Sequence, residues 1–543
     1  MKKILAFILA LVMLGSLVVG CTPTADPNQT TGGNSGETTG VKEELAVDHF
    51  KGTTIKIAVL KKDTDTSGDW SQKPIVKMAE EATGIHVDWI VVDPATVQDK
   101  LASMLMSDDQ PDAYLGFFAT NENVLSNNLE KFYDLSEEGL LETYAPKVKA
   151  DYDSLPMLWN AVTWEDGSIR GLVTGGSVPT GAAGAMTSFH AINQEWLDKA
   201  QMEVPTTADE LYEVLKYFKE HDMDGDGDPN NEIPMTFANG NWEGDLMMYA
   251  AAFGIAGNYT WQAHDHYKNI KDGKVVSTLD TDNYRAFLEF FHKLYSEGLL
   301  DQTGFSQTAD QYSAKRSEKI AGVINTFSTG LDQGYTPFVY QGMAGVDPMI
   351  SGLTTRFMGL RSNFNITANS ENVEATLWWW NWLHKDAETK NIAMFGPNTF
   401  YQDEDGNFWE NQEVVTAEDY VDTVVGMSNF SPVMLPGEKA QTHPDDLVGA
   451  SKIRYDFAEA NKEKMNQEGF ALYYAAPEDV EERGFIESEL YPYIQTFMAD
   501  AIANGLDDAK WDAHLQALKD YGYYDWLDMW QAQEDAAAAA VSN

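Results

Sequence analysis

The first part of the folded chain alternates between strand and helix patterns, and this restricts its fold more than any other feature. Apolar residues at every second position predict strands at 54–60 and 85–91, and a short apolar run predicts a third at 112–118. Between them, Pro74 and Pro94 each begin a stretch with the helical spacing of apolar residues. The order strand–helix–strand–helix–strand indicates the α/β class, with a largely parallel sheet and helices on both faces.

The N-terminus carries an export signal followed by a cysteine. An uncharged apolar run at residues 4–19 follows two lysines and is shorter than the ~20 residues that a membrane-spanning helix needs. The sequence Val-Val-Gly-Cys at 18–21 resembles the lipobox of bacterial lipoproteins, and Cys21 is the only cysteine. We expect residues 1–20 to be a signal peptide and Cys21 to carry lipid, with an ordinary secretory signal as the alternative.

Charge and cysteine content narrow the classes of function. The chain has 85 acidic and 37 basic residues, a formal net charge of −48 that is spread along the sequence. A surface this acidic repels polyanions, so nucleic acid and anionic lipid are poor partners. The absence of cysteine after the signal also argues against disulfides, thiolate nucleophiles and cysteine-based metal sites.

Length and local composition predict a tether and two folded parts. Residues 21–52 begin with a stretch rich in Thr, Gly, Asn, Pro and Ser, which is typical of a flexible linker. The remaining chain, about 490 residues, exceeds one ordinary domain and suggests two lobes. Helical spacing predicts further helices at 282–296 and 372–382 and helical pieces after Asp507.

The most specific motif is an acidic loop that follows a capped helix at 207–218. Asp222, Asp224 and Asp226 stand at positions 1, 3 and 5 of an EF-hand-like calcium loop, with Gly227 at position 6. Position 12 is an isoleucine, so the loop departs from the EF-hand at its end. We expect one structural calcium ion, because close carboxylates repel one another without a cation; an exposed Asp-Gly turn is the alternative. The candidate ligands are Asp222, Asp224, Asp226, Asp228, Asn230 and Glu232.

Around this loop the sequence resembles the family 1 extracellular solute-binding lipoproteins. The resemblance rests on Asn-Gln-Glu-Trp-Leu-Asp-Lys-Ala at 193–200, Val-Pro-Thr-Thr-Ala-Asp-Glu-Leu at 204–211 and Glu-Ile-Pro at 232–234, with further likeness at 83–87 and 294–301. It extends over nearly the whole mature chain. It implies a two-lobed periplasmic-binding-protein-like fold of type II, with a ligand cleft between the lobes and extra C-terminal helices.

The resemblance also implies a function. A member of this family has no catalytic residues, binds an oligosaccharide between its lobes and delivers it to the permease subunits of an ABC importer. It would be a monomer on the extracellular face of the cell membrane, held there by lipid. By family topology, lobe one comprises 53–170 and about 356–440, and lobe two comprises 171–355 and about 441–543.

Two other classes of protein are compatible with the composition. A carbohydrate-active enzyme, a glycoside hydrolase or lyase, would carry paired carboxylates, which spacing cannot identify among 85 acidic residues. The chain contains no G-x-S-x-G, H-E-x-x-H or Walker motif. A lipid-anchored adhesin would also be acidic and bind calcium, but it would have no reason to carry the solute-binding motifs. The sequence His264-Asp265-His266 suggests a metal pair, although such residues in a polar stretch are more often solvated.

The candidate ligand contacts follow the ends of the predicted strands. Sugar rings stack their C–H faces on aromatic rings and pair their hydroxyls with planar polar groups. The chain has 15 tryptophans, most of which we expect in the core, so residues that follow strands are better candidates. By position these resemble the family's sugar-contacting loops. They are Asp63, Trp70, Phe118, Asn121, Asn239, Asn241, Trp242, Phe327 and Arg361.

Overall fold

The folded chain begins at Val47, earlier than the sequence indicates. The chain divides into two units, residues 1–46 and 47–543. In the second unit, the indole N–H of Trp378 donates to the carbonyl of Val47 at 2.8 Å, and the ring of Phe50 lies 6.4 Å from that of Trp378. Residues 47–52, which were expected to be linker, therefore belong to the folded body. The computed structural model describes residues 45–118, 122–175, 181–228, 230–241, 243–255, 266–327, 329–351, 362–465, 470 and 475–542.

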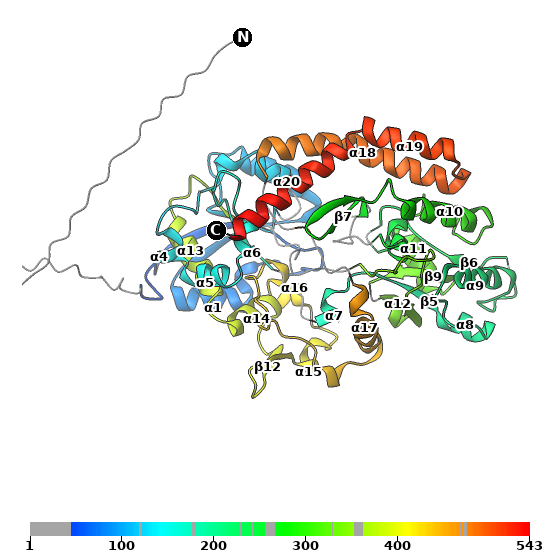
Figure 1. The fold of residues 1–543 in the computed structure, drawn as a ribbon. Helices are drawn as coiled ribbons and strands as arrows, with labels where there is room; N and C mark the ends of the chain where they lie inside the picture. Colours follow the sequence, from blue (N-terminus) through cyan, green and yellow to red (C-terminus); the bar gives the residue numbers. More distant parts are fainter. Residues whose placement is uncertain are drawn as a thin grey trace, which may run out of the picture. The chain divides into compact units, whose positions relative to one another are not determined.

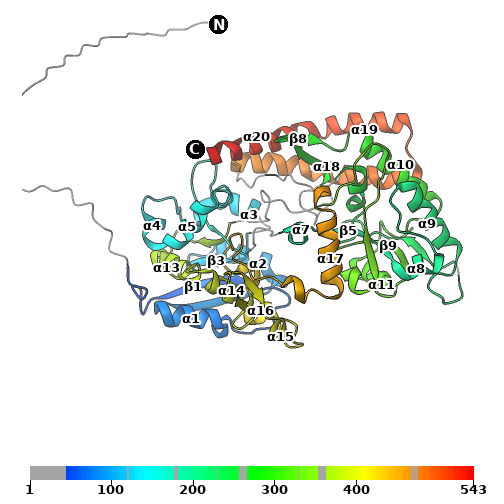
Figure 2. The ribbon, with the colours of Figure 1, turned by 60° about the horizontal axis from the view of Figure 1, so that its bottom comes forward.

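The first sheet has five strands in the order β2-β1-β3-β11-β4. β1 is parallel to β2 and β3, whereas β11 is antiparallel to β3 and β4. The predicted alternation of strands and helices is confirmed, and Figure 2 shows β1 and β3 with α1, α2 and α13 around them. The elements are β1 (Thr54–Leu60), α1 (Pro74–Thr83), β2 (His86–Val92), α2 (Val97–Leu105), β3 (Ala113–Leu115), β4 (Leu172–Val173), β11 (Ser362–Ile366) and α13 (Val373–Leu383).

Alternating apolar residues and a tryptophan-rich helix build the core around this sheet. Ile55, Ile57 and Val59 of β1 are fully buried, as their period-2 spacing predicts. Trp380 on α13 stacks on Phe364 of β11 with ring centroids 4.4 Å apart. Trp378, Trp379 and Trp380 of this helix are buried, which agrees with the expectation that most tryptophans lie in the core.

The second sheet has four strands in the order β10-β5-β9-β6. β5 is antiparallel to β9 and β10, and β6 is parallel to β9. Figure 1 shows α9 and α10 in the part of the molecule that holds this sheet. The two helices start at side-chain caps, Thr207 for α9 and Thr281 for α10, which accept a backbone N–H of the first turn. The elements are β5 (Phe189–Asn193), α8 (Gln194–Ala200), α9 (Ala208–Glu220), β6 (Ile233–Met235), α10 (Asp282–Ser296), α11 (Ala309–Ser317), β9 (Ala321–Thr326) and β10 (Tyr335–Phe338).

The chain leaves the first sheet after β4 and then crosses to the second sheet. The expected division after residue 170 would place β4 in the second lobe, but β4 is hydrogen-bonded to β11 in the first sheet. A strand of two residues leaves no periodic signal, so the sequence could not place it. The chain enters the second sheet between Val173 and Phe189 and returns to the first between Phe338 and Ser362.

Two hairpins and many short helices complete the described structure. The hairpins are β7 (Lys268–Lys271) with β8 (Lys274–Ser277), and β12 (Phe400–Gln402) with β13 (Phe408–Glu410). The remaining α-helices before the C-terminal ones are α3 (Glu122–Ser126), α4 (Leu140–Tyr144), α5 (Pro146–Ser154), α6 (Met157–Asn160), α7 (Gly181–Ala185), α12 (Thr329–Asp332), α14 (Ala387–Phe395), α15 (Gln412–Val415), α16 (Asp422–Val425) and α17 (Gly449–Ala460). The 3₁₀ helices are η1 (Trp70–Gln72), η2 (Pro94–Thr96), η3 (Leu129–Lys131), η4 (Leu246–Phe253), η6 (Ser428–Phe430), η7 (Pro444–Asp446) and η8 (Lys462–Lys464).

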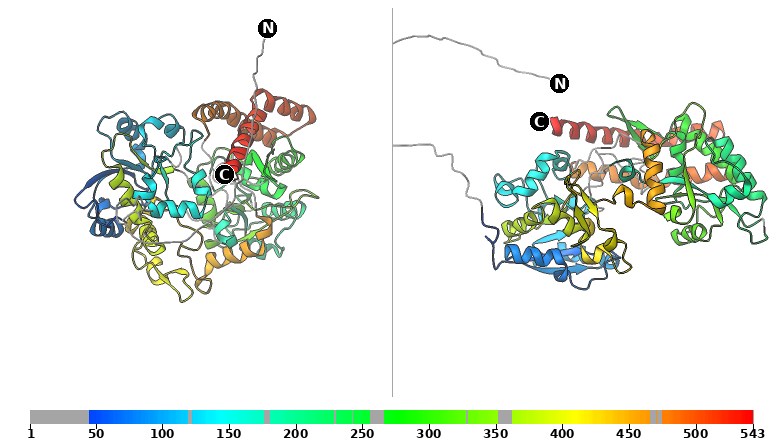
Figure 3. Two further views of the ribbon diagram at one scale, coloured as in Figure 1. Left: turned by 60° about the vertical axis from the view of Figure 1, so that its left-hand side comes forward. Right: turned by 90° about the horizontal axis from the view of Figure 1, so that it is seen from below.

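Three long helices end the chain, α18 (Pro477–Asn504), α19 (Asp508–Asp520) and α20 (Tyr523–Ser542). α18 packs on α10 and also contacts α3, and α20 contacts β8 and α6. Figure 3 shows α20 in red, ending at the C-terminus. The side-chain N–H of Asn160 in α6 donates to the carbonyl of Ala537 in α20 at 3.3 Å. The C-terminal helices therefore contact elements that surround both sheets.

Within the part of the chain that the structure describes, no helix combines the length and the apolar character needed to cross a membrane.

Candidate functional site

The acidic loop between α9 and β6 brings Asp222, Asp224 and Glu232 together. One carboxylate oxygen of each lies within 4.8 Å of the others. The N–H groups of Gly225 and Gly227 donate to the two oxygens of Asp222 at 2.6 and 3.1 Å. Both glycines have positive φ angles, 85° and 95°, which residues with a side chain rarely adopt. The glycines thus allow the backbone to curl around Asp222.

Glu232 supplies the test of whether this cluster fits a metal ion. Its side chain is buried, and Oε1 accepts the backbone N–H of Met223 at 2.6 Å. Its other oxygen, Oε2, is buried and has no hydrogen-bond partner among the described residues. A buried carboxylate oxygen without a donor is costly, and a hard divalent cation takes carboxylate oxygens as ligands. The donor set therefore fits calcium.

The other three expected ligands, Asp226, Asp228 and Asn230, bond within the loop. Asp226 accepts the N–H of Asp228 and the side-chain N–H of Asn231, both at 2.7 Å. Asp228 accepts the side-chain and backbone N–H groups of Asn230, and these bonds hold the pKa of the Asp228 carboxyl below its usual value. As calcium ligands, Asp226, Asp228 and Asn230 remain predictions.

The candidate ligand residues that follow strands of the first sheet differ in exposure. Asp63 lies in an exposed turn after β1. Trp70 is only 1% exposed, with its ring 5.1 Å from that of Trp89. Phe118 is also 1% exposed and packs edge-on against Phe132 at 5.1 Å. The rings of Trp70 and Phe118, expected to face a sugar, belong to the core in this structure, because each contacts other aromatic rings.

A buried ion pair explains the position of Trp70. The indole N–H of Trp70 donates to Asp65 at 2.9 Å, and Asp65 lies 3.3 Å from Nζ of Lys73. Nζ of Lys73 also donates to three backbone carbonyls about 350 positions further along the chain. Burial lowers the pKa of Lys73, and the charge of Asp65 opposes that shift. The three carbonyls belong to Thr423, Val424 and Gly426, at 2.7, 3.0 and 2.9 Å.

The loop after β6 contains a buried polar atom that has no hydrogen-bond partner in the described part of the chain. Asn239 donates its backbone N–H to the carbonyl of Gly304 at 3.0 Å, but its side-chain oxygen is buried without a partner among the described residues. Asn241 uses its side-chain oxygen within the loop, where it accepts the N–H groups of Glu243 and Gly244 at 2.8 and 3.0 Å. Asn239 therefore keeps an acceptor that the described residues do not use, whereas Asn241 shapes the loop.

Glu243 connects this loop to the end of β9, a role that no sequence pattern indicated. Its carboxylate lies 2.6 Å from Nη1 of Arg316, and both side chains are less than 10% exposed, at 7% and 6%. The hydroxyl of Thr326 donates to it at 2.7 Å, and the side chain of Asn325 donates to its carbonyl at 2.7 Å. Glu243 is one of 85 acidic residues, so only the fold distinguishes it.

Asp245 also stabilises the loop that follows β6. It accepts the N–H of Met247 at 2.8 Å, which caps η4, and with its other oxygen the N–H of Gly240 at 2.5 Å. Burial raises the pKa of Asp245 to about 6, against the effect of these two bonds. Glu243 and Asp245 together fasten both ends of the turn that follows Asn239.

Phe327 follows β9 and is the one described aromatic candidate that is partly open, at 37% exposed. The guanidinium of Arg454 lies 4.2 Å from its ring centroid. Its backbone N–H lies 3.4 Å from the carboxylate of Glu243. The contact with Glu243 places Phe327 next to the loop of Asn239, and the contact with Arg454 joins Phe327 to α17.

Several predicted residues lie outside the described part of the chain. They are Cys21, Asn121, Trp242, His264, Asp265 and Arg361.

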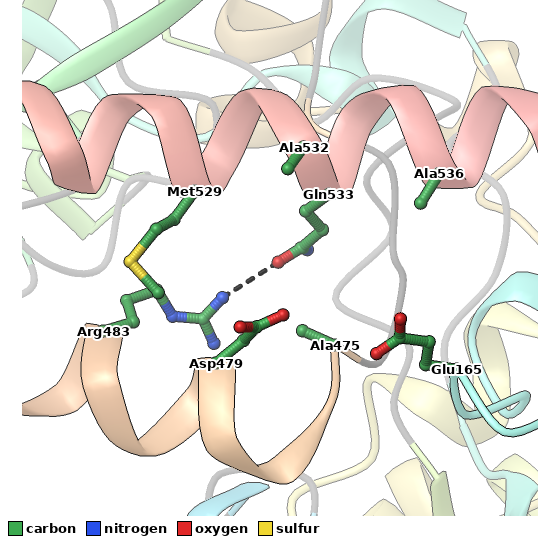
Figure 4. A pocket seen from close by; sticks show the side chains of 8 residues that line it. All are labelled: Glu165, Ala475, Asp479, Arg483, Met529, Ala532, Gln533 and Ala536. Atoms are coloured by element: carbon green, nitrogen blue, oxygen red, sulfur yellow. Dashed lines mark hydrogen bonds between the residues drawn. The ribbon is translucent and has the colours of Figure 1, made fainter. Parts of the chain in front are cut away.

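A cavity of about 190 Å³ lies between α18 and α20 (Figure 4). The guanidinium of Arg483 donates to the side-chain oxygen of Gln533 at 2.9 Å, and the carboxylates of Glu165 and Asp479 border the same space. None of the candidate ligand residues lines it. The lining residues are Glu165, Ala475, Asp479, Arg483, Met529, Ala532, Gln533 and Ala536.

Comparison with known sequences identifies transport proteins. No family model matches the chain. It is 29% identical over 486 residues to the fructooligosaccharide ABC transporter substrate-binding protein FusA of Streptococcus pneumoniae, which covers 86% of this chain and 87% of FusA. It is also 25% identical over 321 residues to lipoprotein LipO of Bacillus subtilis. This match covers 58% of this chain and 55% of LipO.

Comparison with solved structures gives the same class. FusA in complex with kestose has a TM-score of 0.72 at 25% identity, covering 90% of this chain and 100% of FusA. A FusA EF-hand mutant in complex with fructo-nystose has a TM-score of 0.71. An HMO-binding solute-binding protein from Bifidobacterium longum infantis has a TM-score of 0.73 at 21% identity, which supports the fold. The match covers 89% of this chain and 98% of that protein. The similar proteins are binding components of transporters rather than enzymes. With its two sheets and C-terminal helices, the chain shares the two-lobed fold of these solute-binding proteins.

Proposed function

We propose that this chain is the extracellular binding protein of an ABC importer and that it binds an oligosaccharide between its two lobes. The observation that carries the proposal is the likeness to FusA, which extends over 86% of the chain in sequence and includes a sugar-bound structure. The permease subunits of the importer are the expected partner. The alternative of a glycoside hydrolase or lyase has no support from these relatives.

The sheets suggest how the lobes divide. Lobe one comprises the first sheet, from residue 53 through β4 and again from about 356 to 440. Lobe two comprises the second sheet, from β5 to about 355, and the chain after about 441. The lobes are joined where the chain crosses between β4 and β5 and between β10 and β11.

A lipid on Cys21 would hold the protein at the membrane. The proposal rests on the lipobox-like sequence and on the likeness to a Bacillus subtilis lipoprotein. Replacing the cysteine in Cys21→Ala removes the thiol that would carry the lipid. We expect the variant to appear in the medium or to retain its signal peptide; membrane-bound protein of mature size would contradict the proposal.

The acidic loop binds one structural calcium ion in this proposal. Asp222, Asp224 and Glu232 would hold it, and the free oxygen of buried Glu232 supports that set. An EF-hand mutant of FusA indicates that such a loop occurs in a relative. The ion would stabilise the connection between α9 and β6 and would take no part in catalysis.

Calcium is tested by chelation and by Asp224→Asn. Because an ion that binds only the folded state stabilises it, chelation should lower the melting temperature of the wild type. Asp224→Asn should remove most of that sensitivity, while Asp445→Asn, an exposed control, should keep it. Native protein with well under one calcium per chain in elemental analysis would contradict the proposal.

The ligand contacts divide into two groups. Asn239 and Phe327 present an unpaired oxygen and a partly open ring, so we assign them direct contact with the sugar. Asp63 is exposed at a strand end and belongs to the same group. Trp70 and Phe118 support the strand ends from the core. The residues Asn121, Trp242 and Arg361 remain candidates from the sequence.

The function is tested by binding and by the fate of the sugar. A thermal-shift screen of the mature protein against an oligosaccharide panel should identify a ligand, since binding to the native state raises the melting temperature. The purified protein is then incubated for a long period with that sugar, and the products are analysed. Stoichiometric binding with intact sugar supports the transport function; steady release of shortened sugars would favour the hydrolase.

A further inference from the structure

Arg454 of α17 connects three segments that are distant in the sequence. Its guanidinium covers one face of Phe327 at 4.2 Å and donates to the carbonyl of the same residue. It also donates to the carbonyl of Met186 and, at 3.3 Å, to that of Ala183. Phe327 is 127 positions away from it and Met186 is 268 positions away. One side chain thus joins α17, the end of β9 and the end of α7.

The acceptors at α7 explain why an arginine occupies this position. The last carbonyls of a helix have no partner within the helix and carry partial negative charge. A planar guanidinium donates in several fixed directions at once, whereas an ammonium is a single point charge. No ion pair between Arg454 and a carboxylate is found among the residues that the structure describes. Backbone carbonyls and the ring of Phe327 therefore take the place of a carboxylate.

Phe327 is held from two sides. Arg454 lies over one ring face, and the backbone N–H of Phe327 lies 3.4 Å from Glu243, which is itself paired with Arg316. A cation is attracted to the negative face of an aromatic ring, and more strongly when the pair is desolvated. Burial lowers the pKa of Arg454 to about 10, so the side chain keeps its charge at neutral pH. The ring remains 37% exposed although its position is fixed.

We propose that Arg454 is a positioning residue for sugar binding, which holds Phe327 as a fixed aromatic platform and joins it to the chain crossing at α7. The inference rests on the proposed function. α7 lies between β4 of the first sheet and β5 of the second, so the contact links a ligand residue to a segment that connects the lobes. A side chain that is already ordered loses less entropy when a ligand binds.

A double-mutant cycle with Arg454→Met and Phe327→Ala tests the inference, with affinity for the best-binding oligosaccharide as the readout. Phe327→Ala should weaken binding about tenfold, as loss of an aromatic anchor does. Arg454→Met should weaken it about fivefold when Phe327 is present and less than about twofold in the Phe327→Ala background, because residues that act through one another are not additive. Lys452→Met, on the same helix but paired with exposed Asp456, is the matched control and should leave affinity unchanged.

Arg454→Lys separates positioning from folding. The lysine keeps a positive charge but lacks the planar guanidinium with its several fixed donors. The affinity of this variant for the oligosaccharide should therefore lie between those of the wild type and Arg454→Met. If Arg454→Met lowers only the melting temperature, or if the two substitutions are additive, the inference is wrong while the proposed function stands. If the wild type binds no oligosaccharide of the panel, the proposed function fails and the inference fails with it.

Discussion

The loops that follow the strands of the two sheets use their aromatic residues in opposite ways. After the first sheet, Trp70 and Phe118 are each 1% exposed and pack against other rings. After the second sheet, Phe327 is 37% exposed and Asn239 has an unpaired oxygen. Equivalent places in the chain thus carry buried aromatic rings after one sheet, and a partly exposed ring and an unpaired polar atom after the other.

Buried ions account for the difference. Asp65 accepts the indole N–H of Trp70 and pairs with Lys73, so the ion pair holds the ring inward. Glu243 instead accepts from the hydroxyl of Thr326 and lies near the backbone N–H of Phe327, while the ring of Phe327 lies against Arg454 and stays 37% exposed. A strand-end position alone does not decide whether an aromatic residue can contact a ligand.

The largest effect is expected at Trp70. Trp70→Ala should lower the free energy of unfolding by about 3 to 5 kcal/mol, because it leaves a cavity among packed rings. It also removes the donor to buried Asp65. Urea unfolding measures the change, and Met106→Ala, at an 86% exposed position, should shift it by less than about 0.5 kcal/mol. A small loss of stability with a large loss of sugar affinity would show that Trp70 is a ligand contact after all.

Glu243→Gln should lower the free energy of unfolding by about 3 kcal/mol, since it leaves the buried guanidinium of Arg316 without its counter-charge. Sugar affinity should fall as well, because the same carboxylate fastens the loops of Asn239 and Phe327. Glu289→Gln removes an exposed partner of Arg285 and should cost less than about 1 kcal/mol. Equal losses in the two variants, measured by urea unfolding, would contradict the role given to the Glu243 pair.

A buried histidine in the second sheet should make the stability of the protein depend on pH. His190 of β5 stacks on Tyr249 at 5.0 Å, and burial lowers its pKa to about 4. Since the unfolded value is about 6.5, the unfolded state takes up the proton first as pH falls. The contribution of His190 to the free energy of unfolding is therefore fully present above pH 6.5. It should decrease toward pH 4, by up to about 3 kcal/mol.

His190→Phe tests this dependence because it cannot be protonated and preserves an aromatic ring beside Tyr249. Urea unfolding at several pH values between 7 and 4 should give a shallower decline for the variant than for the wild type. Parallel curves would show that His190 does not contribute to acid sensitivity.

The smallest effect on stability is expected at Phe327. Phe327→Ala should change the free energy of unfolding by less than about 1 kcal/mol, because much of the ring is already in contact with solvent. Its effect on binding should be larger than its effect on stability, which is the reverse of Trp70→Ala. A large stability loss with unchanged affinity would remove the contrast between the two sheets.

The local features of this protein were determined by its sequence alone. The alternation in β1, the proline that begins α1, the cap of α9 and the glycines of the acidic loop each depend on residues a few positions apart. Such signals act through backbone preferences and spacing, so they survive without knowledge of the fold. The solute-binding motifs are local in the same sense, and the comparisons confirm the class that they indicate.

The distant contacts were decided only by the tertiary structure. The pairing of β4 with β11, the ion pair of Glu243 with Arg316 and the contact of Arg454 with Phe327 join residues far apart in the chain. Asp65 and Lys73 are close to Trp70 in the sequence, but its burial also depends on the ring of Trp89 in β2 and on carbonyls about 350 positions away that hold Lys73. Burial and the pairing of charges depend on how distant segments pack against one another, and that packing depends on the whole chain.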